Sequence, residues 1–170
     1  MKWDFRKPLV VMSPKSLLRH PMAVSTLDEL TQGSFQEAID DAAARANATK
    51  IERVVFCSGK VYYDLLAEKQ AKKHDTTALV RVEQLFPWPE TALSAITRQY
   101  PNARDFVWTQ EEPRNMGSFW YVCQQDTKPW GGSPLRYAGR AWAASPAVGS
   151  AKVHEAEQRA LIEETFARKP

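Results

Sequence analysis

Several features that are common in enzymes and membrane proteins are missing from this sequence of 170 residues. No apolar run approaches the length of a membrane span, and the N-terminus has no apolar signal-peptide segment. The two cysteines, Cys57 and Cys123, lie in apolar segments and have no partners at metal-ligand spacing. We therefore expect no membrane contact and no metal site in this chain. Unpaired cysteines of this kind are typical of a reducing cytosol.

An excess of charge of one sign is also missing. The formal net charge is +3, and the basic residues are interleaved with acidic ones without forming a stripe. Nucleic-acid-binding domains usually carry a concentrated basic surface, so we expect no nucleic-acid partner. The chain has 44% hydrophobic and 25% charged residues. This composition is typical of a soluble globular domain with a sizeable core.

Complete catalytic motifs are absent as well. The 7 glycines form neither a GxGxxG fingerprint nor a Walker A loop. The three histidines, His20, His74 and His154, lie in separate segments. Neither an HExxH pair nor a nucleophile elbow is found. Taken by themselves, the residues predict no complete active site in this chain.

The clearest positive signal is a strand followed by a tight turn and a helix. Val54–Cys57 is a continuous apolar run, which is typical of a short strand buried on both faces. Ser58 and Gly59 end this strand, because glycine allows the sharp turn that is needed here. The helix that follows is expected to bury Val61, Tyr62, Leu65 and Leu66. We expect this unit at the centre of a sheet, with any ligand near the turn.

Other segments predict further strands and helices around this unit. Strands are expected at residues 8–12, 35–39, 76–82, 105–109 and 135–138. Helices are expected at residues 90–100, 118–125 and 152–168, and residues 40–50 predict a surface loop or a frayed helix. The alternation of strands and helices predicts an α/β fold, a three-layer α/β/α sandwich with a mostly parallel sheet.

Two of the expected helices carry more specific predictions. Ser118 is placed to cap the helix at residues 118–125 through its side-chain oxygen. The periodicity of the final helix predicts one buried face. That face consists of Val153, Ala156, Ala160 and Phe166.

The turn from Ser58 to Lys60 is the first candidate for a ligand site. Backbone N–H groups at the start of a helix attract anions, and Lys60 adds a positive charge. A phosphate-bearing ligand would therefore suit this turn. The alternative interpretation is a tight turn followed by a solvated lysine.

The second candidate is the acidic pair Glu111 and Glu112. Adjacent residues on an extended chain point to opposite faces, so the two carboxylates are not expected to share a proton. One of them could cap a helix or pair with Arg114, and Arg136 and Arg140 could pair with either or bind an anion. The other interpretation is a contact between subunits. The apolar side chains that follow the two glutamates are expected to be exposed, and this favours such a contact. It would use Glu111, Glu112, Arg114, Met116, Phe119 and Trp120.

Longer motifs occur in an order that resembles a known family. They are MSPKSLLRHP (12–21), CSGKVYYDL (57–65), RVEQL (81–85), WTQEEP (108–113), NMG (115–117), RYAGR (136–140) and ASPA (144–147). From about Arg6 to Phe166, the chain closely resembles the C-terminal region of the decarboxylating, thiamine-diphosphate-dependent component of 2-oxoglutarate dehydrogenase.

The resemblance implies a transketolase C-terminal-like domain over residues 31–170. Its mixed sheet would have five strands, with one antiparallel edge strand near Phe35–Ile39. Residues 1–30 would be the tail of a preceding pyrimidine-binding domain and its connector, so the chain would be part of a longer subunit. In this family thiamine diphosphate, its Mg²⁺ and the catalytic histidines belong to the earlier domains. The diphosphate motif Gly-Asp-Gly…Asn is not found in this sequence.

The family reaction is the oxidative decarboxylation of 2-oxoglutarate, with transfer of the succinyl group to a lipoyl group. The resemblance implies a structural role for this domain in a homodimer, where it would brace the preceding domains of the same subunit. The dihydrolipoyl succinyltransferase component would be a further partner, in the bacterial cytoplasm or the mitochondrial matrix. Some similar proteins carry an acyl-CoA or nucleotide effector site on this domain. Here Arg19, Ser58 and Lys60 are the positions expected to hold the phosphate of such an effector.

Two other interpretations remain open from the sequence. The chain could be a free-standing regulatory or docking module that binds a ligand of the CoA or nucleotide type. It could also belong to a paralogue that acts on another 2-oxo acid, because the substrate pocket of the family lies outside the region of resemblance. Under all of these interpretations, we expect the isolated chain neither to bind thiamine diphosphate tightly nor to decarboxylate 2-oxoglutarate.

Overall fold

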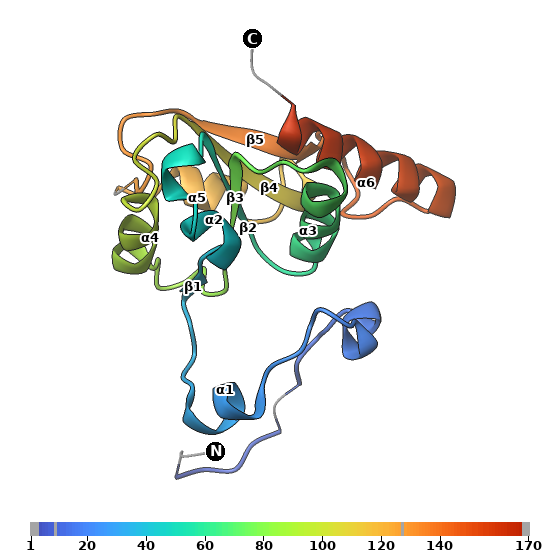
Figure 1. Ribbon diagram of the computed structural model, residues 1–170. Helices are drawn as coiled ribbons and strands as arrows, with labels where there is room; N and C mark the ends of the chain where they lie inside the picture. Colours follow the sequence, from blue (N-terminus) through green and yellow to red (C-terminus); the bar gives the residue numbers. More distant parts are fainter. Residues whose placement is uncertain (1–3, 9, 127, 168–170) are drawn as a thin grey trace. The chain divides into compact units, whose positions relative to one another are not determined.

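The computed structural model describes residues 4–8, 10–126 and 128–167. The chain divides into two compact units, Met1–Ser34 and Phe35–Pro170 (Figure 1). The N-terminal unit contains a 3-10 helix, Lys15–Arg19 (η1), and a short α-helix, Leu27–Gln32 (α1). A capping box starts α1: Glu29 N donates to the Thr26 side chain, and Thr26 N donates to the Glu29 carboxylate at 2.7 Å.

The prediction of a strand at residues 8–12 is wrong for the residues of this range that the structure describes. Residues 8 and 10–12 form no regular structure, and residue 9 lies outside the described residues. Val10, Val11 and Met12 are 80%, 69% and 91% exposed. An apolar run becomes a buried strand only when a neighbouring strand pairs with it. The described part of this unit contains no such strand.

The second unit is built around a five-stranded sheet with the order β1-β3-β2-β4-β5. The strands are β1 (Ala38–Ile39), β2 (Arg53–Cys57), β3 (Thr77–Val82), β4 (Asp105–Pro113) and β5 (Leu135–Arg140). β1 pairs with β3 in antiparallel orientation, and the other pairings are parallel. The predicted mixed sheet, with its antiparallel edge strand within residues 35–39, is therefore confirmed.

The apolar run that forms β2 lies at the centre of this sheet, as predicted. Val54 and Phe56 belong to the core on one face, and Val55 and Cys57 belong to the core on the other. All four side chains are at most 1% exposed. Burial on both faces explains why the run is apolar throughout rather than alternating. Each fully buried side chain of this size contributes about 1.5–3 kcal/mol.

Helices cover both faces of the sheet and complete the predicted three-layer sandwich (Figure 1). The core on the Val55 face is closed by α3 (Val61–Lys72) and α6 (Ala151–Phe166). The core on the Phe56 face is closed by α2 (Ala42–Arg45), α4 (Glu90–Thr97) and α5 (Phe119–Cys123). A 3-10 helix, Ala48–Lys50 (η2), follows α2. None of the helices in the described parts of the chain is long and apolar enough to cross a membrane.

The segment between β1 and β2 is tied to the core and is not a free surface loop. The Asp41 carboxylate accepts a hydrogen bond from Ala44 N at 2.9 Å, which caps α2, and pairs with Lys69 at 2.5 Å. The Tyr100 hydroxyl donates to Asp40 at 2.5 Å, and burial, reinforced by Asp40, raises the pKa of Tyr100. These polar contacts order a segment that has few large apolar side chains.

α6 buries a different face from the one predicted. Of the four expected inner residues, Phe166 is buried, whereas Val153, Ala156 and Ala160 are exposed. The N-terminal half of α6 projects past the sheet in Figure 1. Only the second half of the helix therefore reaches the core, where Leu161 is 1% exposed.

Candidate functional site

A cavity of about 470 Å³ opens at the carboxyl end of the parallel strands. β2 and β4 lie side by side here, but the chain continues from β2 to β3 on one side and from β4 to β5 on the other. Such a switch point is where open α/β sheets bind ligands. The turn after β2 borders this cavity. The lining residues are Ser58, Gly59, Leu85, Phe86, Trp108, Gln110, Glu112, Gly117, Ser118 and Tyr121.

Gln110 organises this end of β4, although it was not among the predicted site residues. Its amide oxygen accepts hydrogen bonds from Trp108 Nε1 and Phe119 N, both at 3.0 Å, and its Nε2 donates to Met116 O at 2.7 Å. Ser118 makes no capping hydrogen bond, contrary to prediction, because its backbone is helical (φ −96°, ψ −7°) and not extended as in a capping residue. Gln110 accepts the hydrogen bond of the first N–H of α5. The one sequence signal for this role is an amide side chain within an apolar strand.

Glu111 and Glu112 lie on opposite sides of the sheet, as the alternation along a strand predicts. The Glu111 carboxylate forms an ion pair with Lys60 at the start of α3. Glu112 lines the cavity on the other face, the face that also carries Gln110. Neither carboxylate pairs with Arg114 within the described residues. The two carboxylates are thus separated by the sheet and cannot share a proton.

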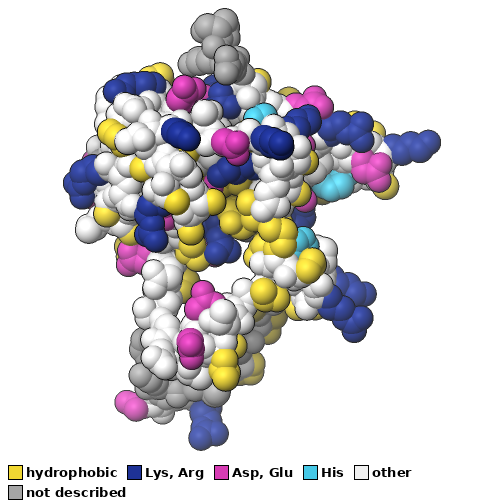
Figure 2. Space-filling model, in the orientation of Figure 1, with side chains coloured by type: hydrophobic (Ala, Val, Ile, Leu, Met, Phe, Trp, Pro, Cys, Tyr) yellow, Lys and Arg dark blue, Asp and Glu magenta, His cyan; other side chains and the backbone are white. Residues whose placement is uncertain are grey.

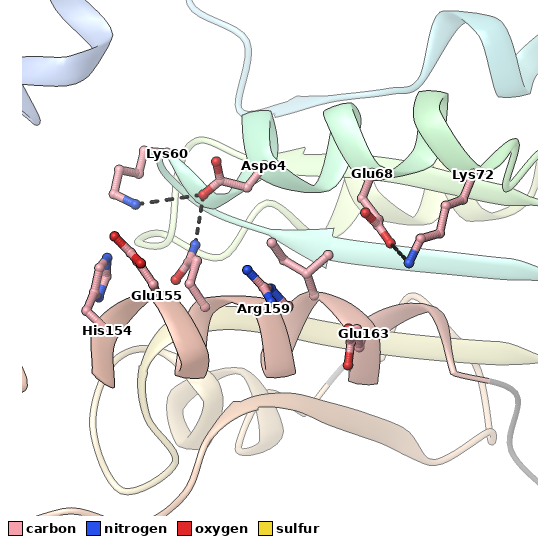
Figure 3. Close-up of a pocket in the computed structure, with 10 residues that line it drawn as sticks. Lys60, Asp64, Glu68, Lys72, His154, Glu155, Arg159 and Glu163 are labelled. Carbon is pink, nitrogen blue, oxygen red and sulfur yellow. Dashed lines mark hydrogen bonds and ion pairs between the residues drawn. The ribbon is translucent and has the colours of Figure 1, made fainter. Parts of the chain in front are cut away.

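Lys60 faces a second, polar depression between α3 and α6, with a volume of about 640 Å³ (Figure 3). Its ammonium group lies 3.9 Å from Asp64, in addition to the ion pair with Glu111. The Asp64 carboxylate in turn accepts a hydrogen bond from Gln158 Nε2 at 2.8 Å. Lys60 is therefore not a freely solvated lysine, because two carboxylates hold it.

The groove between α3 and α6 carries charges of both signs. Its charged lining residues are Lys60, Asp64, Glu68, Lys72, Glu155, Arg159 and Glu163, and His154 also lines it. In Figure 3 the α3 side chains face those of α6 across the depression. Lys72 and Glu68 form an ion pair at 2.7 Å on α3. The hydrogen bond from Gln158 to Asp64 connects the two helices.

The three predicted effector residues lie in different surroundings. Ser58 lines the cavity on the α5 face of the sheet, and Lys60 lines the groove between α3 and α6. Gly59, with a φ of 76°, allows the chain to turn between them. Arg19 is an exposed residue at the end of η1 in the N-terminal unit.

The predicted interface residues differ in their exposure. Phe119 is only 4% exposed and belongs to the core, contrary to expectation, while Met116 is half-buried. Trp120 is 42% exposed and packs edge to face on Trp142, which is 67% exposed, with 6.4 Å between the ring centroids. The Arg114 guanidinium lies 5.7 Å from the centre of the Phe119 ring. An exposed aromatic pair therefore remains on this part of the surface.

Arg136 and Arg140 do not pair with the two glutamates at the end of β4. Arg140 pairs with Glu157 of α6 at 2.6 Å. Arg136 and Arg53 both contact Asp105, at 3.3 and 2.6 Å, at the amino end of the sheet. Partial burial by itself would raise the pKa of Asp105, but the hydrogen bonds and charges of the two arginines outweigh it and hold that pKa below its usual value.

Fold and site together define an α/β sandwich domain with a cavity at the sheet's switch point and ion pairs that join its elements. This chain belongs to the 2-oxoglutarate dehydrogenase C-terminal family, whose model matches residues 24–166. The sequence-based assignment to that family is therefore confirmed.

Named relatives agree with this family. The chain is 47% identical over 168 residues to the 2-oxoglutarate dehydrogenase E1 component of Cupriavidus necator, covering 96% of this chain and 17% of that protein. It is 44% identical over 163 residues to the E1 component of Haemophilus influenzae, with 95% and 17% covered. For the E1 component of Azotobacter vinelandii the identity is 43% over 166 residues, with 95% and 17% covered. The chain thus spans 17% of the length of these relatives.

Proposed function

We propose that this chain acts as the C-terminal domain of a 2-oxoglutarate dehydrogenase E1 component, where it braces the other domains and the second subunit of a homodimer. The observation that carries this proposal is the exposed apolar surface of the N-terminal unit, in which no described residue is buried. Val10, Met12, Leu27 and Leu30 are each at least 72% exposed. An exposed apolar surface of this kind marks a site of contact with another protein surface. The relatives are far longer than this chain, so the preceding domains of the subunit are the proposed partner of this surface.

The exposed tryptophans supply a second contact surface, which we assign to the partner subunit. Trp120 and Trp142 present adjoining aromatic rings to solvent. Aromatic side chains are enriched at the centres of protein interfaces. In the assembled enzyme, succinyl groups would pass to the lipoyl group of the dihydrolipoyl succinyltransferase component.

Thiamine diphosphate and Mg²⁺ belong, in this proposal, to domains outside this chain. Among the residues that the structure describes, no three His, Cys, Asp or Glu side chains are grouped so that they could hold a metal ion. These residues do not fit the Mg²⁺ site of that cofactor, and we assign no step of the reaction to them. The proposed contribution of this domain is the positioning of the domains that carry the chemistry.

We also propose that the phosphate of an acyl-CoA or nucleotide effector binds at Lys60. The other two positions expected for it are left out, because Ser58 lines the cavity on the opposite face of the sheet and Arg19 belongs to the N-terminal unit. The support for the Lys60 site is the groove that Lys60 shares with Lys72 and Arg159. A phosphate would have to replace the carboxylate partners of Lys60. Calorimetry with acetyl-CoA and with AMP should show heat that is lost in Lys60→Ala and kept in Lys128→Ala, a change of an exposed lysine elsewhere. Absence of heat with both ligands would contradict this site.

The bracing role can be tested by adding this chain to an E1 component that lacks the matching region. We expect the chain to bind the shortened enzyme and to restore both its dimer, seen by sedimentation, and its decarboxylation of 2-oxoglutarate. The double change Trp120→Ala and Trp142→Ala should weaken the dimer, whereas Lys128→Ala should not. Turnover by this chain alone, or failure to bind the shortened enzyme, would contradict the proposal. The second result would favour a free-standing module.

A further inference from the structure

The cavity at the carboxyl end of the sheet carries an unbalanced negative charge. Among the described residues that line it, Glu112 is the only charged one. The Glu112 main-chain oxygen accepts a hydrogen bond from the Tyr137 hydroxyl at 3.1 Å. Its carboxylate, however, has neither a hydrogen bond nor an ion pair within the described residues. An exposed, unpaired carboxylate on a residue that lines a cavity is a ready partner for a cation.

The walls of the same cavity are aromatic. Trp108, which is fully buried, lines the cavity, and so does Tyr121, whose ring packs edge to face on Trp88 with 6.4 Å between the centroids. Phe86 also lines the cavity and is 80% exposed. The faces of aromatic rings attract cations, and the planar guanidinium group can also stack on them. Glu112 and these rings therefore favour the same kind of ligand.

Two basic side chains that are close to Glu112 in the fold or the sequence, Lys60 and Arg114, have other partners. Lys60 lies on the opposite side of the sheet, in its ion pair with Glu111. The Arg114 guanidinium lies over the rings of Phe119 and Tyr137, at 5.7 and 5.4 Å from their centres. The cavity volume of about 470 Å³ lies within the range of small-ligand sites, about 300–1,000 Å³. There is thus room for a side chain from outside this unit.

We propose that this cavity binds an arginine side chain of a protein partner, with Glu112 pairing with the guanidinium and with Phe86 and Tyr121 packing against its plane. A protein source is favoured because the loop that lines the cavity at Gly117 and Ser118 continues directly into the exposed Trp120. Arginine and aromatic side chains together form the dominant contacts of many protein interfaces. The inference requires only the cavity and its charge, and it stands apart from the proposed role in an E1 component.

The test titrates this chain with N-acetyl-L-arginine amide, which imitates an arginine within a polypeptide, and follows the backbone amides of Gly59, Gly117 and Ser118 by NMR. We expect saturable shifts at these amides. The neutral analogue N-acetyl-L-citrulline amide should give none. In Glu112→Gln the apparent affinity should fall about tenfold, equivalent to about 1.4 kcal/mol. Glu155→Gln, which removes an exposed carboxylate on α6, is the matched control and should leave the affinity unchanged.

Three results would overturn the proposal. Equal shifts with the arginine and citrulline probes would show that charge is not recognised. An affinity that is unchanged in Glu112→Gln would place the cation elsewhere. Binding of free L-arginine without binding of the blocked amide would identify an amino-acid site instead of a protein contact. Because the residue at position 112 is exposed, the Gln variant should keep the wild-type thermal midpoint, so loss of binding can be separated from loss of folding.

Discussion

The two ends of the parallel sheet differ in whether their acidic residues have charged partners. At the amino end, Arg53 and Arg136 share Asp105, and both guanidinium groups also donate to main-chain carbonyls at the end of α6, including Thr165 O. At the carboxyl end, Glu112 has no charged partner within the described residues and the exposed aromatic surface begins. The charged residues at the amino end therefore hold the domain together. At the carboxyl end Glu111 is likewise paired with Lys60, and only the cavity side, where Glu112 lies, is available for contacts outside the domain. Figure 2 shows charged side chains of both signs spread over the visible face of this unit.

The largest effect on stability should come from Gln110→Leu, because Gln110 is the buried residue beneath the exposed Glu112 at the carboxyl end of β4. The change leaves the Trp108 Nε1–H and the Phe119 N–H without their acceptor in a buried site. We expect a loss of about 3–5 kcal/mol in the free energy of unfolding, measured by urea denaturation. Gln70→Leu, at an exposed position of α3, should cost far less. A similar loss in both variants would contradict this role of Gln110.

Asp105→Ala should produce the next largest effect. It removes the carboxylate that links β2 to β5 and leaves two guanidinium groups close together without their anion. We expect a loss of about 2–3 kcal/mol in denaturation experiments, in the range of hydrogen bonds to charged groups. The control is Asp126→Ala, at an exposed position outside this cluster. An equal stability of the two variants would mean that the amino end is not held by Asp105.

The pH dependence should distinguish Asp105 from the exposed acids. Its pKa in the folded protein is lowered, so the unfolded chain binds this proton more readily than the folded chain does. The stabilising contribution of Asp105 is therefore complete above its unfolded pKa of about 3.9 and is lost as the pH falls through its lower folded pKa. The difference in unfolding free energy between wild type and Asp105→Asn should narrow below about pH 4. A difference that stays constant from pH 6 to pH 3 would contradict the assignment.

The smallest effect on stability should come from Glu112→Gln. The side chain is exposed and unpaired within the described residues, so the expected change in unfolding free energy is within about 0.5 kcal/mol. Thermal and urea denaturation of the variant and of wild type would measure it. A loss as large as that of Asp105→Ala would mean that Glu112 is structural, and the contrast between the two ends of the sheet would disappear.

Short-range patterns predicted much of this fold. The apolar run of β2, the glycine after it and the apolar face of α3 depend on neighbouring residues along the chain, so sequence is enough to identify them. The alternation along β4 likewise separated Glu111 from Glu112. The partners of these glutamates were not predicted correctly, because Lys60 lies 51 residues from Glu111 in the chain. Contacts of this kind depend on which strands become neighbours.

By itself, the sequence determined the family, the three-layer α/β/α fold and the position of β2 in the centre of the sheet. Those features follow from local periodicity and from motifs that extend along most of the chain. Tertiary structure alone decided that residues 8 and 10–12 are exposed, that the first half of α6 projects past the sheet, and that Gln110 accepts a hydrogen bond from the first N–H of α5. The physical reason is that burial and pairing depend on what lies across from a residue, and a linear pattern shows only what lies beside it.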